Sequence, residues 1–298
     1  MACCGFANEA LCSPHLPPEL ERTIFELAAI SRPSSIPTLM LIAHRVKQWV
    51  EPLLYRVSFI CRIIPGKMHD FPSLPLEVLL SAIDKKPPSF FKWSVTHIYL
   101  EGGSDTEPDL SVLPTILAAC PRVVDLMFFG QSDTSYRVAL DQLECLRRLT
   151  IEVEPLFAPN TIDFTVPLFH NVTHLELLDD CDEISADIGT ALALAPALTH
   201  LSCARLFRLP VSIFHARIRA IATLQCIVYF IFRRLVECPD PHDARMVCID
   251  RFDSRSDWLR GAASGKDYWA FAEEFIAAKR AGSVDESHYF IILESWKI

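Results

Sequence analysis

A short apolar phrase recurs along the middle of the chain, with aliphatic or aromatic residues at its first and fourth positions and an apolar residue at its sixth. Its six copies begin at Val95, Val123, Leu146, Val172, Leu198 and Leu224. Each copy has the length of a short strand, and helix-compatible stretches such as 110–119 and 186–195 lie between copies. Strands that alternate with helices at short intervals predict a parallel sheet.

The copies start 28, 23, 26, 26 and 26 residues apart. This spacing is similar to the roughly 20–29-residue period of leucine-rich repeats. One such unit cannot bury its apolar edge alone, so stacked neighbours must share a continuous core. We therefore predict an α/β fold, an irregular leucine-rich-repeat solenoid of parallel strands plus helices over residues 57–250. Within or beside this range we expect an opening strand in 54–60, a helix in 74–83 and a further strand at 247–249.

The polar positions inside the repeated phrase predict a recognition surface. Side chains alternate along a strand, so the residues that flank each inner aliphatic residue point away from the core. A row of charged, aromatic and soft side chains on such a face is typical of a protein-binding surface. The candidate target-binding residues are His97, Tyr99, Asp125, Met127, Arg148, His174, Glu176 and His200. Two alternatives stay open: an ordinary solvated sheet face, or a face covered by the C-terminal segment.

Two amphipathic segments precede the repeats. Apolar residues recur at helical spacing from Leu20 to Ala28 and again from Leu39 to Leu53, which predicts two short helices. Neither helix can bury its apolar face alone, so each must pack on the other, on the array or on a partner. We expect a helical module at 14–56 behind a flexible N-terminus at 1–13.

The repeat pattern weakens after about residue 235, and residues 251–298 are expected to form a helical cap and tail. Residues 268–281 have helical character, with Ser264 and Asp267 spaced as a capping box and Gly282 as a stop. We expect this helix to close the open end of the array, as repeat proteins require. The apolar stretch 289–293 is either a final strand or an artefact of gene prediction.

Composition and charge narrow the possible partners. The chain is 51% hydrophobic and carries a formal charge of −9, from 28 Lys and Arg against 37 Asp and Glu. This acidic balance disfavours nucleic acid. The eleven cysteines include no C-x-x-C pair, which favours a reducing compartment. The longest apolar stretch, 220–232, is too short to span a bilayer. We expect a cytoplasmic or nuclear protein with no membrane partner.

Residues 16–56 resemble the F-box, especially the degenerate version common in fungal F-box-like proteins. The matching text runs Leu16-Pro17-Pro18-Glu19-Leu20 with Ile24-Phe25, then 39–43 through Trp49, and closes with 51–56. Departures are Ala43 and His44, where a cysteine-rich stretch is common, and repeats that lack the usual asparagine after the strand. The resemblance implies docking on a Skp-type adaptor of a cullin complex. The implied adaptor-binding residues are Leu16, Pro17, Leu20, Ile24, Phe25, Leu39, Ile42 and Trp49. The alternative is that they pack internally and seal the first repeat.

Candidate chemistry is sparse. The chain contains no G-x-G-x-x-G, G-x-x-x-x-G-K-[ST], G-x-S-x-G or H-E-x-x-H motif. His174 and His200 are expected on adjacent strands about 4.8 Å apart, but with Glu176 they form an incomplete metal site. The acidic run at 179–183 is expected to be a solvated loop. We predict no cofactor and no metal.

An F-box followed by leucine-rich repeats resembles a substrate receptor of a cullin-RING ubiquitin ligase. The resemblance implies a non-catalytic substrate-recognition subunit that bridges an unknown protein target to a Skp-cullin-F-box-type ligase. One alternative is a repeat scaffold for protein–protein interaction with no link to a ligase. The other is an unrecognised α/β enzyme, which a deep polar pocket with converging titratable residues would favour.

Overall fold

A computed structural model describes residues 16–60, 71, 74–102, 110–130, 132–180, 188–205, 211–231, 240, 243–250 and 253–292. The expected flexible N-terminus at 1–13, residues 181–183 of the acidic run and the tail beyond 292 lie outside these residues. The solvated loop expected at 179–183 is wrong for Asp179 and Asp180, which belong to the strand His174–Asp180; Asp179 is buried and accepts hydrogen bonds from the amides of Val153 and Glu154. Among the described helices, none is long and apolar enough to cross a membrane.

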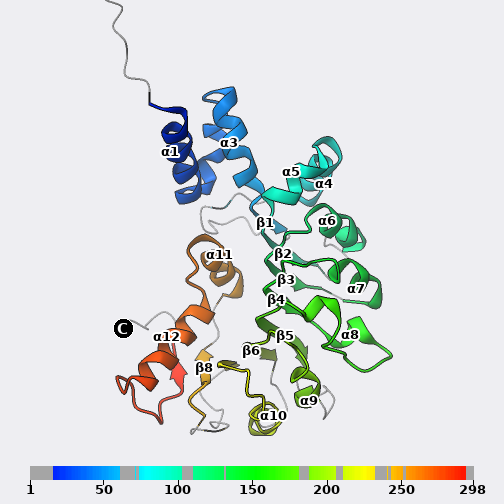
Figure 1. The fold of residues 1–298 in the computed structure, drawn as a ribbon, viewed down its shortest axis with the longest axis vertical. Coiled ribbons are helices and arrows are strands. Elements are labelled where there is room, and N and C mark those ends of the chain that lie inside the picture. The colour runs from blue at the N-terminus through cyan, green and yellow to red at the C-terminus, as the bar shows by residue number, and fades with distance from the viewer. Residues whose placement is uncertain are drawn as a thin grey trace, which may run out of the picture.

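One parallel sheet runs through the described part of the chain, and its nine strands follow one another in sequence order (Figure 1). The strands are β1 (Val57–Ile60), β2 (His97–Glu101), β3 (Asp125–Phe129), β4 (Arg148–Ile151), β5 (His174–Asp180), β6 (His200–Arg205), β7 (Cys226–Ile231), β8 (Met246–Asp250) and β9 (Phe290–Ile291). The prediction of an α/β fold with a parallel sheet is confirmed. The strands expected within 54–60, at 247–249 and within 289–293 are present as β1, β8 and β9.

The six copies of the apolar phrase lie side by side in register. Their fourth residues form one continuous row across β2 to β7: Ile98, Leu126, Leu149, Leu175, Leu201 and Ile227. All of them are almost completely buried in the largest hydrophobic cluster. Each position of the phrase thus pairs with the same position of the next copy, because every unit buries its apolar edge against an equivalent neighbour.

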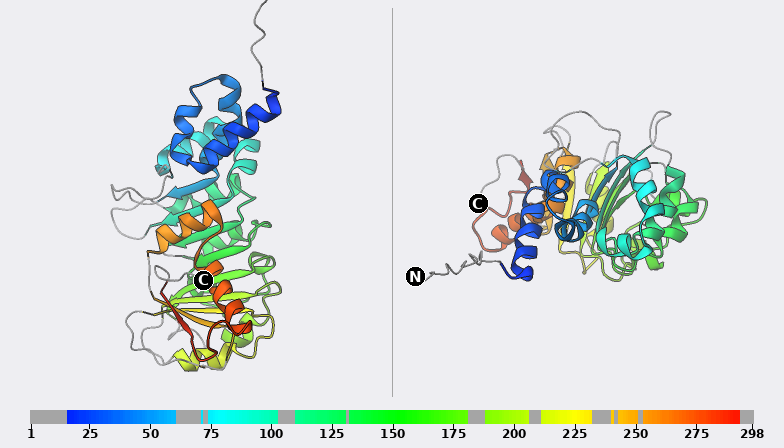
Figure 2. Two further views of the ribbon diagram at one scale, coloured as in Figure 1. Left: turned by 90° about the vertical axis from the view of Figure 1, so that its left-hand side faces the viewer. Right: turned by 90° about the horizontal axis from the view of Figure 1, so that it is seen from above.

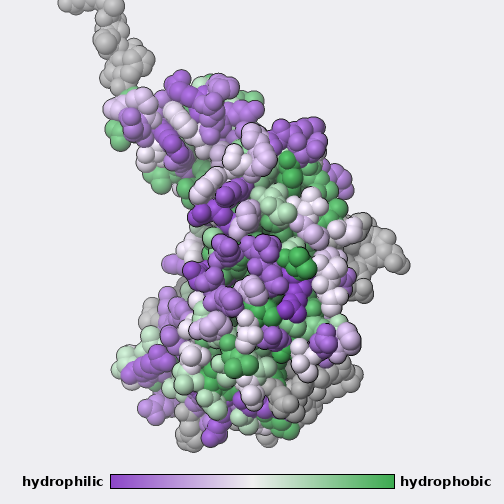
Figure 3. Space-filling view, turned by 45° about the vertical axis from the view of Figure 1, so that its right-hand side comes forward, coloured by the Kyte–Doolittle hydropathy of each residue, from purple (hydrophilic) through white to green (hydrophobic). Residues whose placement is uncertain are grey.

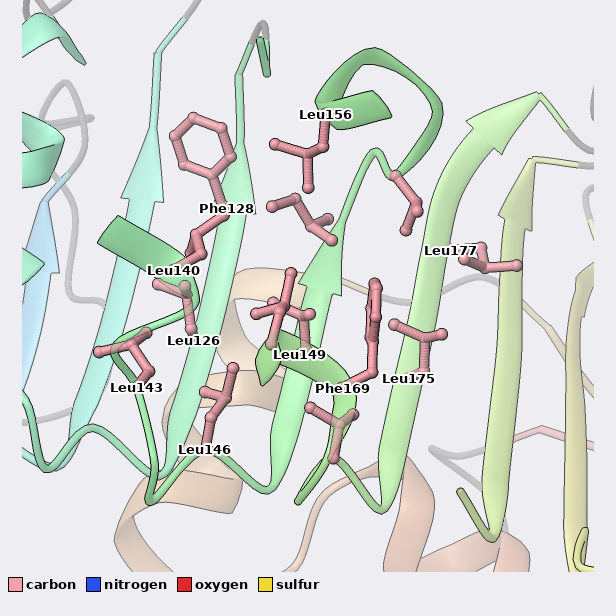
Figure 4. Close-up of a cluster of buried hydrophobic side chains, with 14 of the residues drawn as sticks. Leu126, Phe128, Leu140, Leu143, Leu146, Leu149, Leu156, Phe169, Leu175 and Leu177 are labelled. Atoms are coloured by element: carbon pink, nitrogen blue, oxygen red, sulfur yellow. The ribbon is translucent and has the colours of Figure 1, made fainter. Parts of the chain in front are cut away.

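Short helices cover one face of the sheet and complete this core. They are α4 (Leu76–Lys85), α5 (Pro88–Ser94), α6 (Leu113–Ala119), α7 (Thr134–Leu140), α8 (Glu154–Phe157), α9 (Ile188–Leu192) and α10 (Val211–Ile218), with the 3₁₀ turns η2 (Leu110–Val112) and η3 (Pro167–Phe169). Figure 4 shows Leu126, Leu149 and Leu175 of the strands packed against Leu140 and Phe169 from the connections. The helix expected at 74–83 is α4.

A helical module precedes the sheet. It contains α1 (Pro18–Ser31), η1 (Pro33–Ser35), α2 (Ile36–Leu39) and α3 (His44–Tyr55). The module has its own small core, formed by Ala29, Ile36, Val46 and Val50. The second expected helix is interrupted, because the backbone at Ala43 is extended (φ −160°, ψ 154°) and α3 begins only after it. The chain then passes from α3 directly into β1.

The C-terminal helices lie on the opposite face of the sheet (Figures 1 and 2). They are α11 (Ser254–Ser264) and α12 (Tyr268–Arg280). The helix expected at 268–281 is present, but it does not close the end of the array, so that expectation is wrong. The reason is its apolar face: Ala272, Phe275 and Ile276 pack on Val228 and Val247.

The capping box at the start of α12 is also wrong in detail. Asp267 is itself the N-cap and accepts a hydrogen bond from the amide of Ala270, whereas Ser264 is the last residue of α11. Gly282, two residues after the end of α12, has a φ of 72°, and the helix stops before it as expected.

Candidate functional site

Exposed apolar side chains gather on the N-terminal module. Leu20, Ile24 and Leu27 follow one another at helical spacing on α1, and each exposes more than half of its surface. In the turn after α2, Leu41 is 86% exposed and Ile42 is 56% exposed. Figure 3 shows this module as an upper lobe whose visible face is mostly hydrophilic, with hydrophobic residues at its margins. A cluster of this kind on a small module is typical of a protein-binding surface.

The residues that the F-box resemblance implies for adaptor binding divide into two groups. The exposed ones are Leu16, Pro17, Leu20, Ile24 and Ile42. Phe25, Leu39 and Trp49 are partly buried and pack against the core of the module. The internal-packing alternative therefore describes the second group only.

The polar row on the sheet face is assembled in register, as its spacing predicts. His97, Asp125, Arg148, His174, His200 and Cys226 are successive partners across β2 to β7. The row is not an open surface, however. Tyr99, Met127, Asp125, Glu176 and His200 each expose less than a tenth of their area, and His97, Arg148 and His174 are partly buried. The expectation of a solvent-facing recognition row is therefore corrected: α11 and α12 cover it, which is the alternative of a face covered by the C-terminal segment.

Helix α11 covers the row near β1 to β3. The indole Nε1 of Trp258 donates to Asp125 Oδ1 at 2.9 Å. The Trp258 ring also lies edge-on to Tyr99, with centroids 5.6 Å apart, and to His97 at 6.2 Å. One tryptophan thus satisfies a buried carboxylate and buries two predicted target-binding rings.

Helix α12 and the segment before it cover the row near β4 to β6. Asp267 forms an ion pair with Arg148. The hydroxyl of Tyr268 donates to Glu176 Oε2 at 3.0 Å, and Thr150 donates to the same oxygen at 3.1 Å. Each charged group on this part of the face therefore has a partner in the C-terminal segment, which lowers the cost of burying it.

A cavity of about 120 Å³ remains between the sheet face and the two helices. Its walls combine aromatic rings with ionisable groups. Residues lining it include Asp125, Met127, Arg148, His174, Glu176, Asp257, Trp258, Asp267, Tyr268 and Trp269. Such a mixture of apolar walls and a few converging polar groups is typical of a ligand site.

Burial shifts the acids around this cavity toward neutral pH. It raises the pKa of Asp125 to about 6, and raises the pKa values of Glu176 and Asp257 to about 7 each. Burial disfavours the charged carboxylate, and the hydrogen bonds from Trp258 and Tyr268 offset only part of that penalty. Acids with pKa values near neutrality can give up and take protons under physiological conditions.

Two histidines of the row form a stacked pair next to the cavity. The rings of His174 and His200 are 4.0 Å apart and nearly parallel, at 8°. Burial lowers the pKa of His174 to about 2 and that of His200 to about 4. Glu273 of α12 places Oε1 at 2.9 Å from His200 Nε2 and at 4.0 Å from His174 Nε2. The carboxylate that joins these two histidines is thus Glu273, and not the Glu176 that the sequence groups with them.

Sequence reasoning missed the residues that the C-terminal segment contributes, namely Asp257, Trp258, Asp267, Tyr268, Trp269 and Glu273. The Trp258–Asp125 and Tyr268–Glu176 bonds join residues 133 and 92 positions apart. The only available signal was indirect: a sheet face that carries Asp, Arg, His and Glu in register needs polar partners if anything covers it.

No family model matches the chain, and no curated protein matches it.

Proposed function

We propose that this chain is a non-catalytic substrate-recognition subunit that bridges a protein target to a Skp-cullin-F-box-type ubiquitin ligase. In this proposal the module 16–56 is an F-box-like adaptor-binding unit, and the strand–helix units behind it are an irregular leucine-rich-repeat array. The ligase chemistry belongs to the other subunits.

The observation that carries the proposal is the apolar stripe of α1 together with Leu41 and Ile42. The module buries its own core of Ala29, Ile36 and neighbours, so the stripe is not needed to hold the module together. A partner that covers these aliphatic side chains gains roughly 25 cal/mol of hydrophobic free energy for each Å² of apolar surface removed from water. A partner with an apolar groove or helix face fits such a stripe, as in helix-in-groove recognition.

Target binding by the polar row on the sheet face requires the helices that cover this row to move. Because α11 and α12 cover Asp125 and Glu176, a target reaches them only when these helices leave the sheet. The scaffold alternative, a repeat array that recruits no ligase, shares this requirement. Adaptor binding separates the two.

The adaptor experiment uses the full chain co-expressed with a Skp-type adaptor and compares three forms. In the double variant Leu20→Asp plus Ile24→Asp, charges replace the centre of the exposed stripe, and we expect adaptor co-purification to fall at least tenfold. Val138→Asp is the matched control, because Val138 on α7 is also an exposed aliphatic residue, at 72%. It should leave adaptor binding unchanged.

Circular dichroism and thermal unfolding are measured for all three forms to check that both variants keep the wild-type fold. Equal adaptor binding by all three forms, or none by the wild-type chain, refutes the ligase link and favours the scaffold.

The cavity favours a second candidate, an α/β enzyme that acts on a small molecule. The carboxyl groups of Glu176 and Asp257 with pKa values near 7 are suited to proton transfer. A small-molecule library screened by thermal shift against wild type and Asp257→Asn tests this candidate. It predicts a compound class that stabilises the wild type and loses its effect in the variant. A library with no such class counts against the enzyme.

A further inference from the structure

The stacked histidines and Glu273 bring three metal-ligating groups together from three elements. His174 begins β5, His200 begins β6 and Glu273 lies in the middle of α12. Their ligand atoms all lie within 4.8 Å of one another. Among the described residues this is the one group of three or more His, Cys, Asp or Glu side chains with that geometry.

The threonine before each histidine lies beside one of its two ring nitrogens, Nδ1. Thr173 Oγ1 donates its single proton to the carbonyl of Arg147 at 3.1 Å, and it also lies 2.8 Å from His174 Nδ1. When the hydroxyl proton goes to the carbonyl, Nδ1 carries the hydrogen and donates to the oxygen, and this is the tautomer that a metal ion on Nε2 selects. In the neutral ring Nε2 then bears a lone pair. A histidine whose second nitrogen donates to a fixed acceptor is the usual arrangement of a metal ligand.

The same arrangement is repeated on the next strand. Thr199 Oγ1 donates to the carbonyl of Thr173 at 3.2 Å and lies 2.8 Å from His200 Nδ1. In this tautomer Nε2 of His200 and Nε2 of His174 each carry a lone pair, at 2.9 Å and 4.0 Å from Glu273 Oε1. Two acceptors cannot stably face each other at the 2.9 Å that separates His200 Nε2 from Glu273 Oε1 unless a proton or a cation lies between them. One proton satisfies this contact alone, whereas a metal ion also satisfies His174.

We propose that His174 Nε2, His200 Nε2 and Glu273 bind a divalent transition metal ion of the zinc class. Zinc ligands at about 2.0–2.1 Å in a tetrahedron lie roughly 3.3–3.4 Å from one another. The separations of 2.9 Å and 4.0 Å from Glu273 Oε1 bracket this value. Because the two rings stack at 8°, at least one of them turns out of the stack so that both in-plane lone pairs point at one ion. Two imidazoles and one carboxylate are an established ligand set for zinc, with a fourth position for water.

The surroundings are compatible with a cation. Trp269 packs edge-on against His174 at 5.2 Å and against His200 at 5.8 Å, so both rings have an aromatic wall on one side. The nearby positive charge of Arg148 is paired with Asp267. The Glu273 side chain is 53% exposed, so a metal ion and its water have access from solvent. Since Glu273 belongs to α12, the ion would fasten the C-terminal helix to the sheet.

The test uses the chelator-treated full chain titrated with Zn²⁺ and, separately, with Co²⁺. Wild type is compared with Glu273→Gln and with Glu274→Gln, the exposed neighbour on the same helix. We expect Glu273→Gln to weaken Zn²⁺ binding at least tenfold in calorimetry, and Glu274→Gln to bind like wild type. Zn²⁺ should also raise the thermal unfolding midpoint of wild type and Glu274→Gln, but not that of Glu273→Gln.

Co²⁺ distinguishes this site from the cysteines, because thiolate ligands add a sulfur-to-cobalt charge-transfer band that nitrogen and oxygen ligands lack. Visible d–d bands without that band, lost in Glu273→Gln, are the expected result. Equal binding by all three proteins, a thiolate band alone, or no binding by wild type overturns the proposal. None of these outcomes depends on the adaptor experiment, so the two proposals stand or fall separately.

Discussion

Replacing Asp125 by asparagine tests the electrostatic account of the covered sheet face. Asp125 is 8% exposed, and its Oδ1 accepts the hydrogen bond from Trp258 of α11. Asparagine keeps the shape and this acceptor but carries no charge. The substitution therefore removes the burial penalty of the carboxylate while leaving the packing in place.

The magnitude follows from the raised pKa. Burial moves the pKa of Asp125 from 3.8 to about 6, which corresponds to roughly 3 kcal/mol at about 1.36 kcal/mol for each pKa unit. Because the folded pKa is raised, the favourable contribution is fully present below about 3.8 and is lost as the pH rises through about 6. We expect Asp125→Asn and wild type to be equally stable near pH 4. At pH 7.5 the variant should be more stable by up to about 3 kcal/mol.

The assay is urea unfolding followed by tryptophan fluorescence at closely spaced pH values from 4 to 8. The buried histidines also lose stability in acid, because the pKa of His97 and of His200 is lowered to about 4, but this loss is common to both proteins and cancels in the difference. Asp84→Asn is the control, because Asp84 on α4 is exposed, and it should change stability by less than about 0.5 kcal/mol. A difference between Asp125→Asn and wild type that does not grow with pH refutes the reasoning.

Two further predictions concern packing and backbone conformation. Leu201→Ala in the apolar row should destabilise the fold by about 2–5 kcal/mol in urea unfolding, because the side chain is completely buried. Leu194→Ala, at a residue that is 56% exposed, should cost far less, and equal costs would contradict the shared core. Gly265→Ala between α11 and α12 should cost about 1–2 kcal/mol, since its φ is +72° and no atom lies near the added methyl group. An unchanged or raised melting temperature would contradict that strain.

Much of the array can be predicted from the spacing of apolar residues alone. The phrase that begins at Val95 and recurs to Leu224 fixes strand positions, their parallel direction and their register, since each unit repeats the same local pattern. The helix at 76–85 and the two helical segments before the sheet are also visible in local periodicity. Short-range patterns of this kind need no information from distant residues.

The candidate site is only half predictable in the same way. The spacing places His174 and His200 side by side on adjacent strands, because register is a local property of the repeat. It does not indicate that Glu273 completes the group, nor that Glu176 turns to Tyr268. Those pairings depend on where α12 packs, and an amphipathic helix has the same periodicity whether it covers the end of an array or its face.

The sequence by itself therefore determined the repeated strands, their order and the identity of the residues along the polar row. Only the tertiary structure decided that α11 and α12 cover that row and convert an expected open surface into a cavity with buried acids and paired histidines. The physical reason is the range of the interactions. Strand register follows from apolar spacing within each unit, whereas the cover depends on Trp258 and Tyr268 finding partners about a hundred residues away.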